Sequence, residues 1–257
     1  MLHGPRLGAL VPPLDADGPH IRLGVAWAAL TVLAAAVGVV ALAAVMAVAA
    51  LGAAGQAARS WRRSKPKRTP FRPVAIGGAV LIALAGAGGP VAVVVAAAAV
   101  GVAALVAGRA RVGRRRSDTT LTAAISLLVG GGAAAPTVAL QHLGFVAVLV
   151  LLLSVHAFDA SVYVIGTGGR RWVGVVAGIA AVGALSLFAA GVFAPPFRGS
   201  APWVLGGLLA VTLPFGPVVA SLLVPSARVT VPALRRIDSL LVAAPVWLVV
   251  AALTLAM

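Results

Sequence analysis

Long apolar blocks alternate with short basic runs along this chain of 257 residues. A helix needs about 20 apolar residues to cross a hydrocarbon core of about 30 Å, and most of the blocks have about that length. The blocks expected to cross a membrane as helices are 74–89, 91–108, 119–140, 144–166, 172–193, 203–224 and 238–257. The pattern therefore predicts an all-α fold, a polytopic integral membrane helical bundle.

The first apolar block, residues 23–58, is longer than one crossing requires. As a single helix rising 1.5 Å per residue it would be about 54 Å long, which exceeds the hydrocarbon thickness. We therefore expect either a tight hairpin near Gly38 or one span that continues into a surface helix. With this block, the bundle would contain eight or nine transmembrane helices.

Two regions follow from the same pattern. Residues 1–22 contain four prolines and two aspartates without a continuous apolar run, so we expect a mobile tail and no cleaved signal peptide. Residues 23–257 are expected to form a single transmembrane domain. Within it, residues 23–140 supply the N-terminal helices, and residues 144–257 supply the helices that carry the candidate site.

The composition supports a membrane protein and limits its chemistry. Hydrophobic residues make up 61% of the chain and charged residues 10%, against about 25% charged residues in soluble domains. This excludes a water-soluble globule. The absence of cysteine excludes disulfides and thiolate metal sites. The chain has no Glu, and its five acidic residues are Asp15, Asp17, Asp118, Asp159 and Asp238.

The basic residues, which give a net charge of +15, gather in runs at 59–72, 109–116, 170–171 and 228–236. Two apolar blocks separate each run from the next, so all four runs are expected on one side, which the positive-inside rule makes cytoplasmic. A cytoplasmic N-terminus then gives nine spans and an external one gives eight; Arg6 and Arg22 favour nine. The runs would face anionic lipid headgroups. A specific anionic ligand is the alternative, and no nucleic-acid partner is expected.

Asp159 lies inside the block 144–166, where a carboxylate facing lipid would be costly. His156 precedes it by three residues and Tyr163 follows it by four, so the three side chains share one helical face. Two interpretations remain open. The group either forms a metal or phosphate site that opens to the cytoplasm, or makes a buried Asp–His or Asp–Tyr hydrogen bond that locks two helices together.

Two further basic segments are candidates for ligand binding. Arg235 and Arg236 precede Asp238 and Ser239 at the start of the last block. The polar pair caps the helix there, or Asp238 is a second site carboxylate beside arginines able to bind phosphate. The turn 166–171, with Arg170 and Arg171, is rich in glycine and precedes a helix, so it is either a basic turn or an anion site.

Several motifs in the C-terminal half resemble those of the CDP-diacylglycerol synthase family, the phosphatidate cytidylyltransferases. Residues 234–247 read LRRIDSLLVAAPVW and are similar to the family signature LDRIDSLxxAxPVF. Asp159, Tyr163 and Gly166 fit the spacing of the motif DxxAYxxG. Residues 172–174, WVG, resemble WEG, and residues 216–221, GPVVAS, fall where the family has GDLxES.

The resemblance implies an all-helical membrane fold in which Mg²⁺, held by acidic residues, positions CTP for attack by the phosphate of phosphatidic acid. Asp159 and Asp238 match the carboxylates that would be catalytic and hold the metal. Arg236 and Ser221 match other motif residues. The residues expected to bind substrate are His156, Tyr163, Arg170, Arg171, Ser221, Arg235 and Arg236.

Four acidic residues of the family motifs are replaced in this chain, by Val173, Pro217, Ala220 and Arg235. The SPKKT motif expected after Arg171 is absent. The chain is thus a divergent member of the family it resembles, and three functions remain open: a Mg²⁺-dependent cytidylyltransferase, a non-catalytic relative in lipid binding or membrane assembly, and a small transporter. The Ala-, Gly- and Arg-rich composition suggests a bacterial inner membrane. A homo-oligomer is compatible with the sequence.

Overall fold

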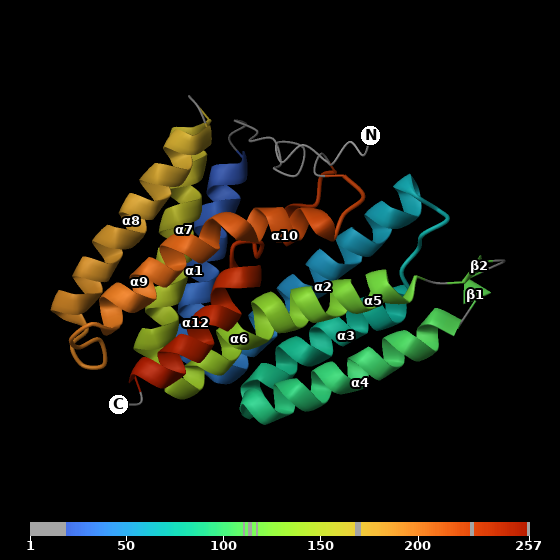
Figure 1. Ribbon diagram of the computed structural model, residues 1–257, viewed down its shortest axis with the longest axis horizontal. Helices are drawn as coiled ribbons and strands as arrows, with labels where there is room; N and C mark the ends of the chain where they lie inside the picture. The colour runs from blue at the N-terminus through green and yellow to red at the C-terminus, as the bar shows by residue number, and fades with distance from the viewer. Residues whose placement is uncertain are drawn as a thin grey trace, which may run out of the picture.

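The computed structural model describes residues 19–109, 111–112, 115–116, 118–167, 171–226 and 229–255, and it forms a helical bundle (Figure 1). Its helices are α1 (Pro19–Val37), α2 (Val39–Ser64), α3 (Arg72–Ala85), α4 (Gly89–Arg109), α5 (Thr119–Ser126), α6 (Ala135–Ala139), α7 (Phe145–Gly166), α8 (Arg171–Val192), α9 (Ala201–Thr212), α10 (Gly216–Leu222), α11 (Pro232–Arg235) and α12 (Leu240–Leu255). A two-residue antiparallel pair, β1 (Arg111–Val112) with β2 (Arg115–Arg116), lies between α4 and α5.

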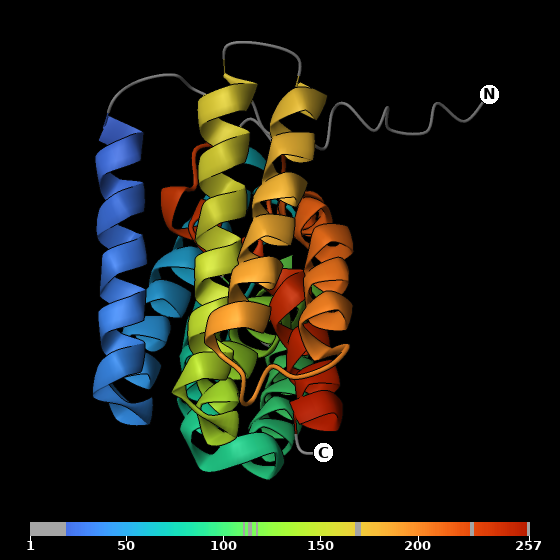
Figure 2. The same ribbon diagram turned by 90° about the vertical axis from the view of Figure 1, so that its left-hand side faces the viewer.

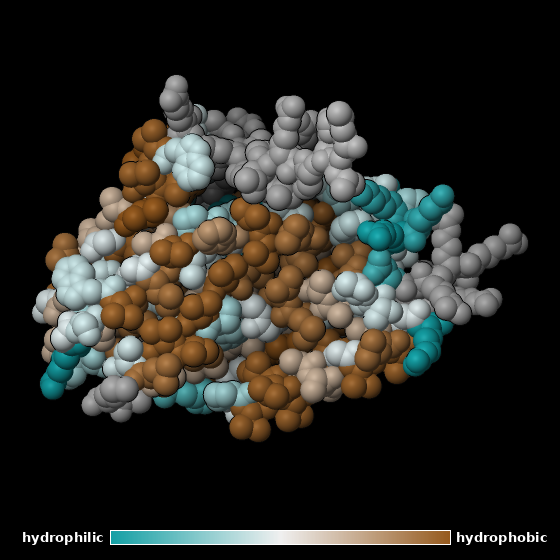
Figure 3. All heavy atoms as spheres, viewed as in Figure 1, coloured by the Kyte–Doolittle hydropathy of each residue, from teal (hydrophilic) through white to brown (hydrophobic). Residues whose placement is uncertain are grey.

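Seven helical segments among the described residues are long and apolar enough to cross a membrane. They are Val39–Ser64, Arg72–Arg109, Thr119–Leu143, Phe145–Gly166, Trp172–Val192, Ala201–Leu222 and Pro232–Leu255, and Arg22–Val37 is a shorter apolar helix. Large apolar side chains also cover the outside of the bundle, as the brown spheres in Figure 3 show; Val37 and Val91, for example, are more than three-quarters exposed. The prediction of a multi-pass membrane helical bundle is therefore confirmed.

The first apolar block forms a hairpin, one of the two arrangements expected for it. α1 ends at Val37, Gly38 adopts φ +132°, and α2 runs back against α1 (Figure 2). A side chain is strongly disfavoured at this φ value, which explains why glycine occupies the turn. α1 begins at Pro19, four residues before the expected start of the block, because proline is well tolerated in the first turn of a helix.

A second hairpin divides the segment 72–109. The 3₁₀ turn η2 (Gly86–Gly88) ends α3, and Gly89 at φ +84° starts α4 in the opposite direction (Figure 1). α3 packs against both α4 and α5. The two expected helices 74–89 and 91–108 therefore correspond to the two arms of this hairpin.

The connections sort onto two sides of the bundle, as Figures 1 and 2 show together. The end of α2, the end of α4, the end of α7 and the start of α8 lie toward the top and right of Figure 1, and the described residues Arg62, Arg63 and Arg109 belong to the ends of α2 and α4. The turns at Gly38, at 86–88 and at 193–200 lie toward the bottom and left. This arrangement agrees with the expected placement of the basic runs on one side.

Three of the membrane-length segments are interrupted helices. α5 passes through a π-helical stretch, η3 (Leu127–Ala134), into α6, and α6 continues through η4 (Leu140–Leu143). α9 is joined to α10 by the 3₁₀ turn η5 (Leu213–Phe215), which contains Pro214. α11 is joined to α12 by the turn 236–239. The last two interruptions bring polar residues into the bundle, and the candidate site lies there.

Candidate functional site

Asp159 and Asp238 converge on one serine. Asp159 is half-buried on α7, and its Oδ1 accepts a hydrogen bond of 2.6 Å from the hydroxyl of Ser239. The backbone N–H of the same serine donates to Oδ1 of Asp238 at 2.8 Å. Ser239 is 1% exposed and Asp238 6%. The two carboxylates that the sequence predicts as partners therefore meet at the start of α12, within electrostatic range of one another.

Arg235 occupies the other side of Asp238. Its Nη1 lies 3.5 Å from Oδ2 of Asp238 and 3.4 Å from the carbonyl oxygen of Pro217, and its Nη2 lies 3.4 Å from Oγ of Ser221. The Ser221 hydroxyl donates to the Pro217 carbonyl at 2.8 Å. The guanidinium thus joins α10 to the start of α12, and three residues of the expected site, Ser221, Arg235 and Asp238, are in direct contact.

The close approach of α10 to the turn 236–239 depends on Gly216. A Cβ atom at this position would overlap the carbonyl oxygen of Asp238 and lie 2.6 Å from Cα of Ser239. Gly174 has the same role between α7 and α8, since a Cβ there would lie 2.8 Å from the carbonyl oxygen of Val162. Both glycines belong to the motifs that resemble the cytidylyltransferase family, and both permit backbone contacts that a larger residue would block.

The other two side chains on the Asp159 face of α7 have different surroundings. Nε2 of His156 lies 3.0 Å from the hydroxyl of Thr31 on α1, so these two residues are hydrogen-bonded. The hydroxyl of Tyr163 is buried and has no hydrogen-bond partner. Asp159 is therefore hydrogen-bonded to Ser239, and the Asp–His or Asp–Tyr bond considered from the sequence does not form. A helix-to-helix hydrogen bond does form, but it joins α7 to α12 through Ser239.

Arg236 lies between α1 and α7. It interacts electrostatically with both His156 and Asp159. Its Nη1 reaches α1 so closely that a Cβ at Gly24 would lie 3.0 Å from it. Arg171 begins α8, but its side chain lies outside the described part of the structure, as does Arg170. Their expected contribution to substrate binding stays a prediction.

The residues present do not fit the Mg²⁺ site that the family resemblance implies. Mg²⁺ prefers octahedral oxygen coordination, commonly with one or two carboxylates that keep several waters. Here one carboxylate is paired with Arg235 and the other accepts the Ser239 hydroxyl. Among the described residues, no three His, Cys, Asp or Glu side chains gather where they could hold a metal ion. A fixed guanidinium beside Asp238 would repel the cation.

The structure also gives contacts around the candidate site that the sequence did not reveal. Ser239 is expected from the sequence only to cap the last helix; its backbone N–H does contact Asp238, but its hydroxyl connects to Asp159, 80 residues away. Thr31 is the partner of His156, yet it lies in an apolar block without a motif. Contacts of this kind depend on helix packing, and only the polar character of Thr31 within that block hinted at a partner.

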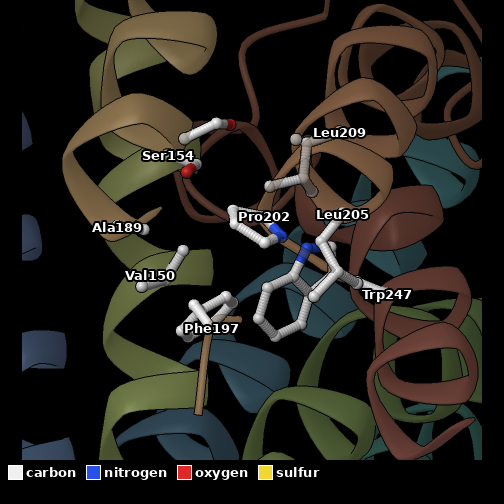
Figure 4. Close-up of a pocket in the computed structure, with 10 residues that line it drawn as sticks. Val150, Ser154, Ala189, Phe197, Pro202, Leu205, Leu209 and Trp247 are labelled. Carbon is white, nitrogen blue, oxygen red and sulfur yellow. The ribbon is translucent and has the colours of Figure 1, made fainter. Parts of the chain in front are cut away.

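A small cavity lies away from these residues, between α7, α8, α9 and α12 (Figure 4). Its volume is about 10 Å³, which corresponds to about one water molecule. Ser154, Phe197, Pro202, Leu205 and Trp247 are among its lining residues, and most of its wall is apolar. The cavity is too small for a lipid headgroup or a nucleotide, so it is not the candidate site.

Fold and site together describe a multi-pass membrane protein with a polar, charge-paired cluster near its basic side. In comparison with known proteins, the chain matches no family model, no curated protein sequence and no solved structure. The likeness to CDP-diacylglycerol synthases therefore rests on the motif residues alone, and the relationship stays a hypothesis.

Proposed function

We propose that this protein is a non-catalytic relative of the phosphatidate cytidylyltransferases that binds the headgroup of phosphatidic acid or another anionic lipid. The observation that carries the proposal is the contact of Arg235 with Asp238 and Ser221. A guanidinium stands beside the carboxylate on which a metal would depend. Arg235 stands at a motif position where the enzyme family has an acidic residue, so the position is kept and its charge is reversed.

The charge balance of the cluster supports anion binding. In their ionised forms the two aspartates, Asp159 and Asp238, are balanced by Arg235 and Arg236, so the cluster carries no excess negative charge for a divalent cation. The basic runs at 170–171 and 228–236 add positive charge on the same side, in a chain with a net charge of +15. Such a surface attracts anionic lipids, with about 1 kcal/mol for each basic residue near the headgroups.

The same charge balance argues against cytidylyl transfer. A triphosphate and a lipid phosphate repel each other, and phosphoryl-transfer enzymes use metal ions to neutralise the charge that develops between them. The four acidic motif positions occupied by Val173, Pro217, Ala220 and Arg235 would have to supply that metal with ligands. Binding of a phosphate by arginines needs none of these carboxylates.

We propose nine membrane crossings with a cytoplasmic N-terminus in a bacterial inner membrane. The crossings would be α1, α2, α3, α4, the α5–α6 segment, α7, α8, the α9–α10 segment and the α11–α12 segment. This count places the basic runs in the cytoplasm and Arg198 on the external side, which satisfies the positive-inside rule.

Native mass spectrometry of the full chain in nanodiscs tests the proposal. The nanodiscs contain phosphatidylcholine with a minor fraction of phosphatidic acid. The lipids that stay bound to the protein after its release from the nanodisc are identified and counted. We expect phosphatidic acid to be retained several-fold above its share, and Arg236→Gln to reduce that enrichment. Arg198→Gln, on the opposite side, is the matched control and should leave it unchanged. Equal retention of both lipids by the folded wild-type protein would refute the proposal.

A further inference from the structure

A polar seam runs between α1 and α7 on the lipid-exposed flank of the bundle. The two helices run antiparallel (Figure 2), and the hydrogen bond between Thr31 and His156 fixes their register. Toward the basic side, Trp27 lies one turn from Thr31 on α1, and Asp159 lies one turn from His156 on α7, so these two residues are at the same level. One further turn along each helix, Gly24 is level with Tyr163. The Thr31–His156 pair closes the inner end of this seam.

Two hydrogen-bond donors in the seam have no acceptor. Nε1 of Trp27, on α1, and the hydroxyl of Tyr163, on α7, are both shielded from solvent, and neither has a hydrogen-bond partner. Buried donors of this kind are rare, and each costs about 1–3 kcal/mol when it stays unpaired. Their occurrence on two facing helices at neighbouring levels indicates that an acceptor is supplied from outside the protein.

The charge in the seam specifies the acceptor. Arg236 extends from the α11–α12 turn to the level of Gly24, and Gly24 lies opposite Tyr163. The guanidinium therefore stands at the same level as the unpaired hydroxyl. Among the described residues, Asp159 is the acidic side chain of this seam, but it accepts the Ser239 hydroxyl from α12 and also interacts electrostatically with Arg236. Two neutral donors beside a guanidinium form a receptor for an anion with several oxygen atoms.

We infer that the seam between α1 and α7 binds a phosphate group through Trp27 Nε1, the Tyr163 hydroxyl and Arg236. This inference rests on the proposed function and deepens it by assigning the residues that receive the headgroup. Phosphate presents more acceptor oxygens than a carboxylate, so it satisfies both donors and the guanidinium together. α1 is joined to α2 by a turn at Gly38, and its exposed side chains, such as Leu23, Leu30 and Leu33, show that it lies on the outside of the bundle, next to the membrane in the proposed topology.

Three conservative variants test the seam in nanodiscs. Tyr163→Phe and Trp27→Phe each remove one donor and keep an aromatic ring. Trp247→Phe is the matched control, because Nε1 of Trp247 is also buried without a partner but lies at the small cavity between α7, α9 and α12. The melting temperature is measured in phosphatidylcholine alone, with added phosphatidic acid, and with inorganic phosphate in place of the lipid.

We expect Tyr163→Phe and Trp27→Phe to reduce the apparent affinity for phosphatidic acid by about three- to tenfold each, since one charge-assisted hydrogen bond is lost. Trp247→Phe should leave that affinity unchanged. Without an added anion, both seam variants should melt at or slightly above the wild-type temperature, because an unpaired donor has been removed. A response to inorganic phosphate equal to that of the lipid would identify free phosphate as the source of the group.

The outcomes separate this inference from the proposed function. If phosphatidic acid stabilises the wild type and all three variants equally, the headgroup binds elsewhere, so the seam is excluded while lipid binding stands. If neither anion stabilises any form of the folded protein, the proposed function fails and the seam fails with it. If Tyr163→Phe lowers the melting temperature in phosphatidylcholine alone, its hydroxyl already has a partner such as a water molecule, which overturns the inference.

Discussion

Two regions of the bundle, one from α3 to α6 with η2 and η3 and the other of α7, α10 and α12, differ in the groups that join their helices. In the first, backbones meet through glycine: a Cβ at Gly86 would lie 2.7 Å from the carbonyl oxygen of Ala135, and one at Gly130 would lie 2.7 Å from that of Ala79. The second region also has a close backbone contact, at Gly216, but there charged side chains join the helices as well, with Asp159, Arg235 and Asp238 at the centre. Both regions lie in apolar segments, with a mean hydropathy of 1.7–2.6 in the first and 1.8–2.2 in the second.

The two regions differ in whether charged groups enter their apolar segments. Small residues suffice to pack membrane helices, because close backbone approach supplies the van der Waals contact. Charged residues within such helices are expensive and are retained where they serve a function. The polar cluster at α7, α10 and α12 is therefore the place to which the proposed function is assigned, and the close glycine contacts at η2 and η3 are read as packing contacts.

The largest expected effect is the loss of the buried ion pair. Arg235→Leu leaves Asp238, whose side chain is 9% exposed, without its guanidinium partner. Removing one member of a buried pair typically costs about 3–5 kcal/mol. The melting temperature in detergent should fall markedly, and the double variant Arg235→Leu with Asp238→Leu should recover much of the loss, since no unpaired charge is left.

Arg68→Leu is the matched control for this prediction. It breaks the pair between Arg68 and Asp118, whose atoms are 3.9 Å apart and whose side chains are 72% and 24% exposed. An exposed pair contributes about 0–1 kcal/mol, so the melting temperature should change little. Equal losses for Arg68→Leu and Arg235→Leu would contradict the distinction between the polar cluster and the rest of the bundle.

The second prediction concerns glycine packing in η3. Gly130→Ala places a Cβ 2.7 Å from the backbone oxygen of Ala79, which has no freedom to move aside, and overpacking of this kind costs up to about 3 kcal/mol. The neighbouring substitution Gly131→Ala meets only Cγ2 of Ile82 at 3.8 Å, an ordinary contact, and should be tolerated. Melting temperatures of the two variants, measured side by side, test this; a more destabilising Gly131→Ala would show that the close contact is misplaced.

The smallest expected effect is the loss of single hydroxyl groups. Ser239→Ala removes the only hydrogen bond that the described residues give to the Asp159 carboxyl group, which should cost about 1–2 kcal/mol because a half-buried acceptor is left unpaired. Ser126→Ala is the counterpart in the apolar region, where the hydroxyl donates only to backbone carbonyls that are otherwise paired within helices. We expect the Ser126 variant to melt close to the wild type. The reverse order of the two losses would argue against a special role for the polar cluster.

The helices could be predicted from the sequence where charges or glycines bound an apolar block. The block 144–166 corresponds to α7, and the hairpin at Gly38 follows from a block too long for one crossing. The interruption at η3 could not be predicted, because the sequence stays apolar through it, whereas Pro214 marks the interruption at η5 and was outweighed by the apolar run around it. Their backbone geometry depends on packing against neighbouring helices.

The candidate site could be predicted only in part. The motif resemblance singles out Asp159, Ser221, Arg235, Arg236 and Asp238, and the structure brings these residues to one side of the bundle. The bond between Ser239 and Asp159 joins residues 80 positions apart, and the register of α1 on α7 depends on Thr31 and His156. No local pattern encodes either contact, so the seam and its unpaired donors emerge only from the assembled helices.

The central claim, that charge pairing has replaced metal-dependent catalysis, is tested most directly by transfer of radiolabelled CMP from CTP to lipid. Purified protein is incubated with phosphatidic acid, CTP and Mg²⁺, beside an Asp159→Ala variant and an active phosphatidate cytidylyltransferase. We predict no incorporation above background by protein that is folded and retains phosphatidic acid. Incorporation that requires Mg²⁺ and is lost in Asp159→Ala would contradict the claim and show that two carboxylates suffice for catalysis.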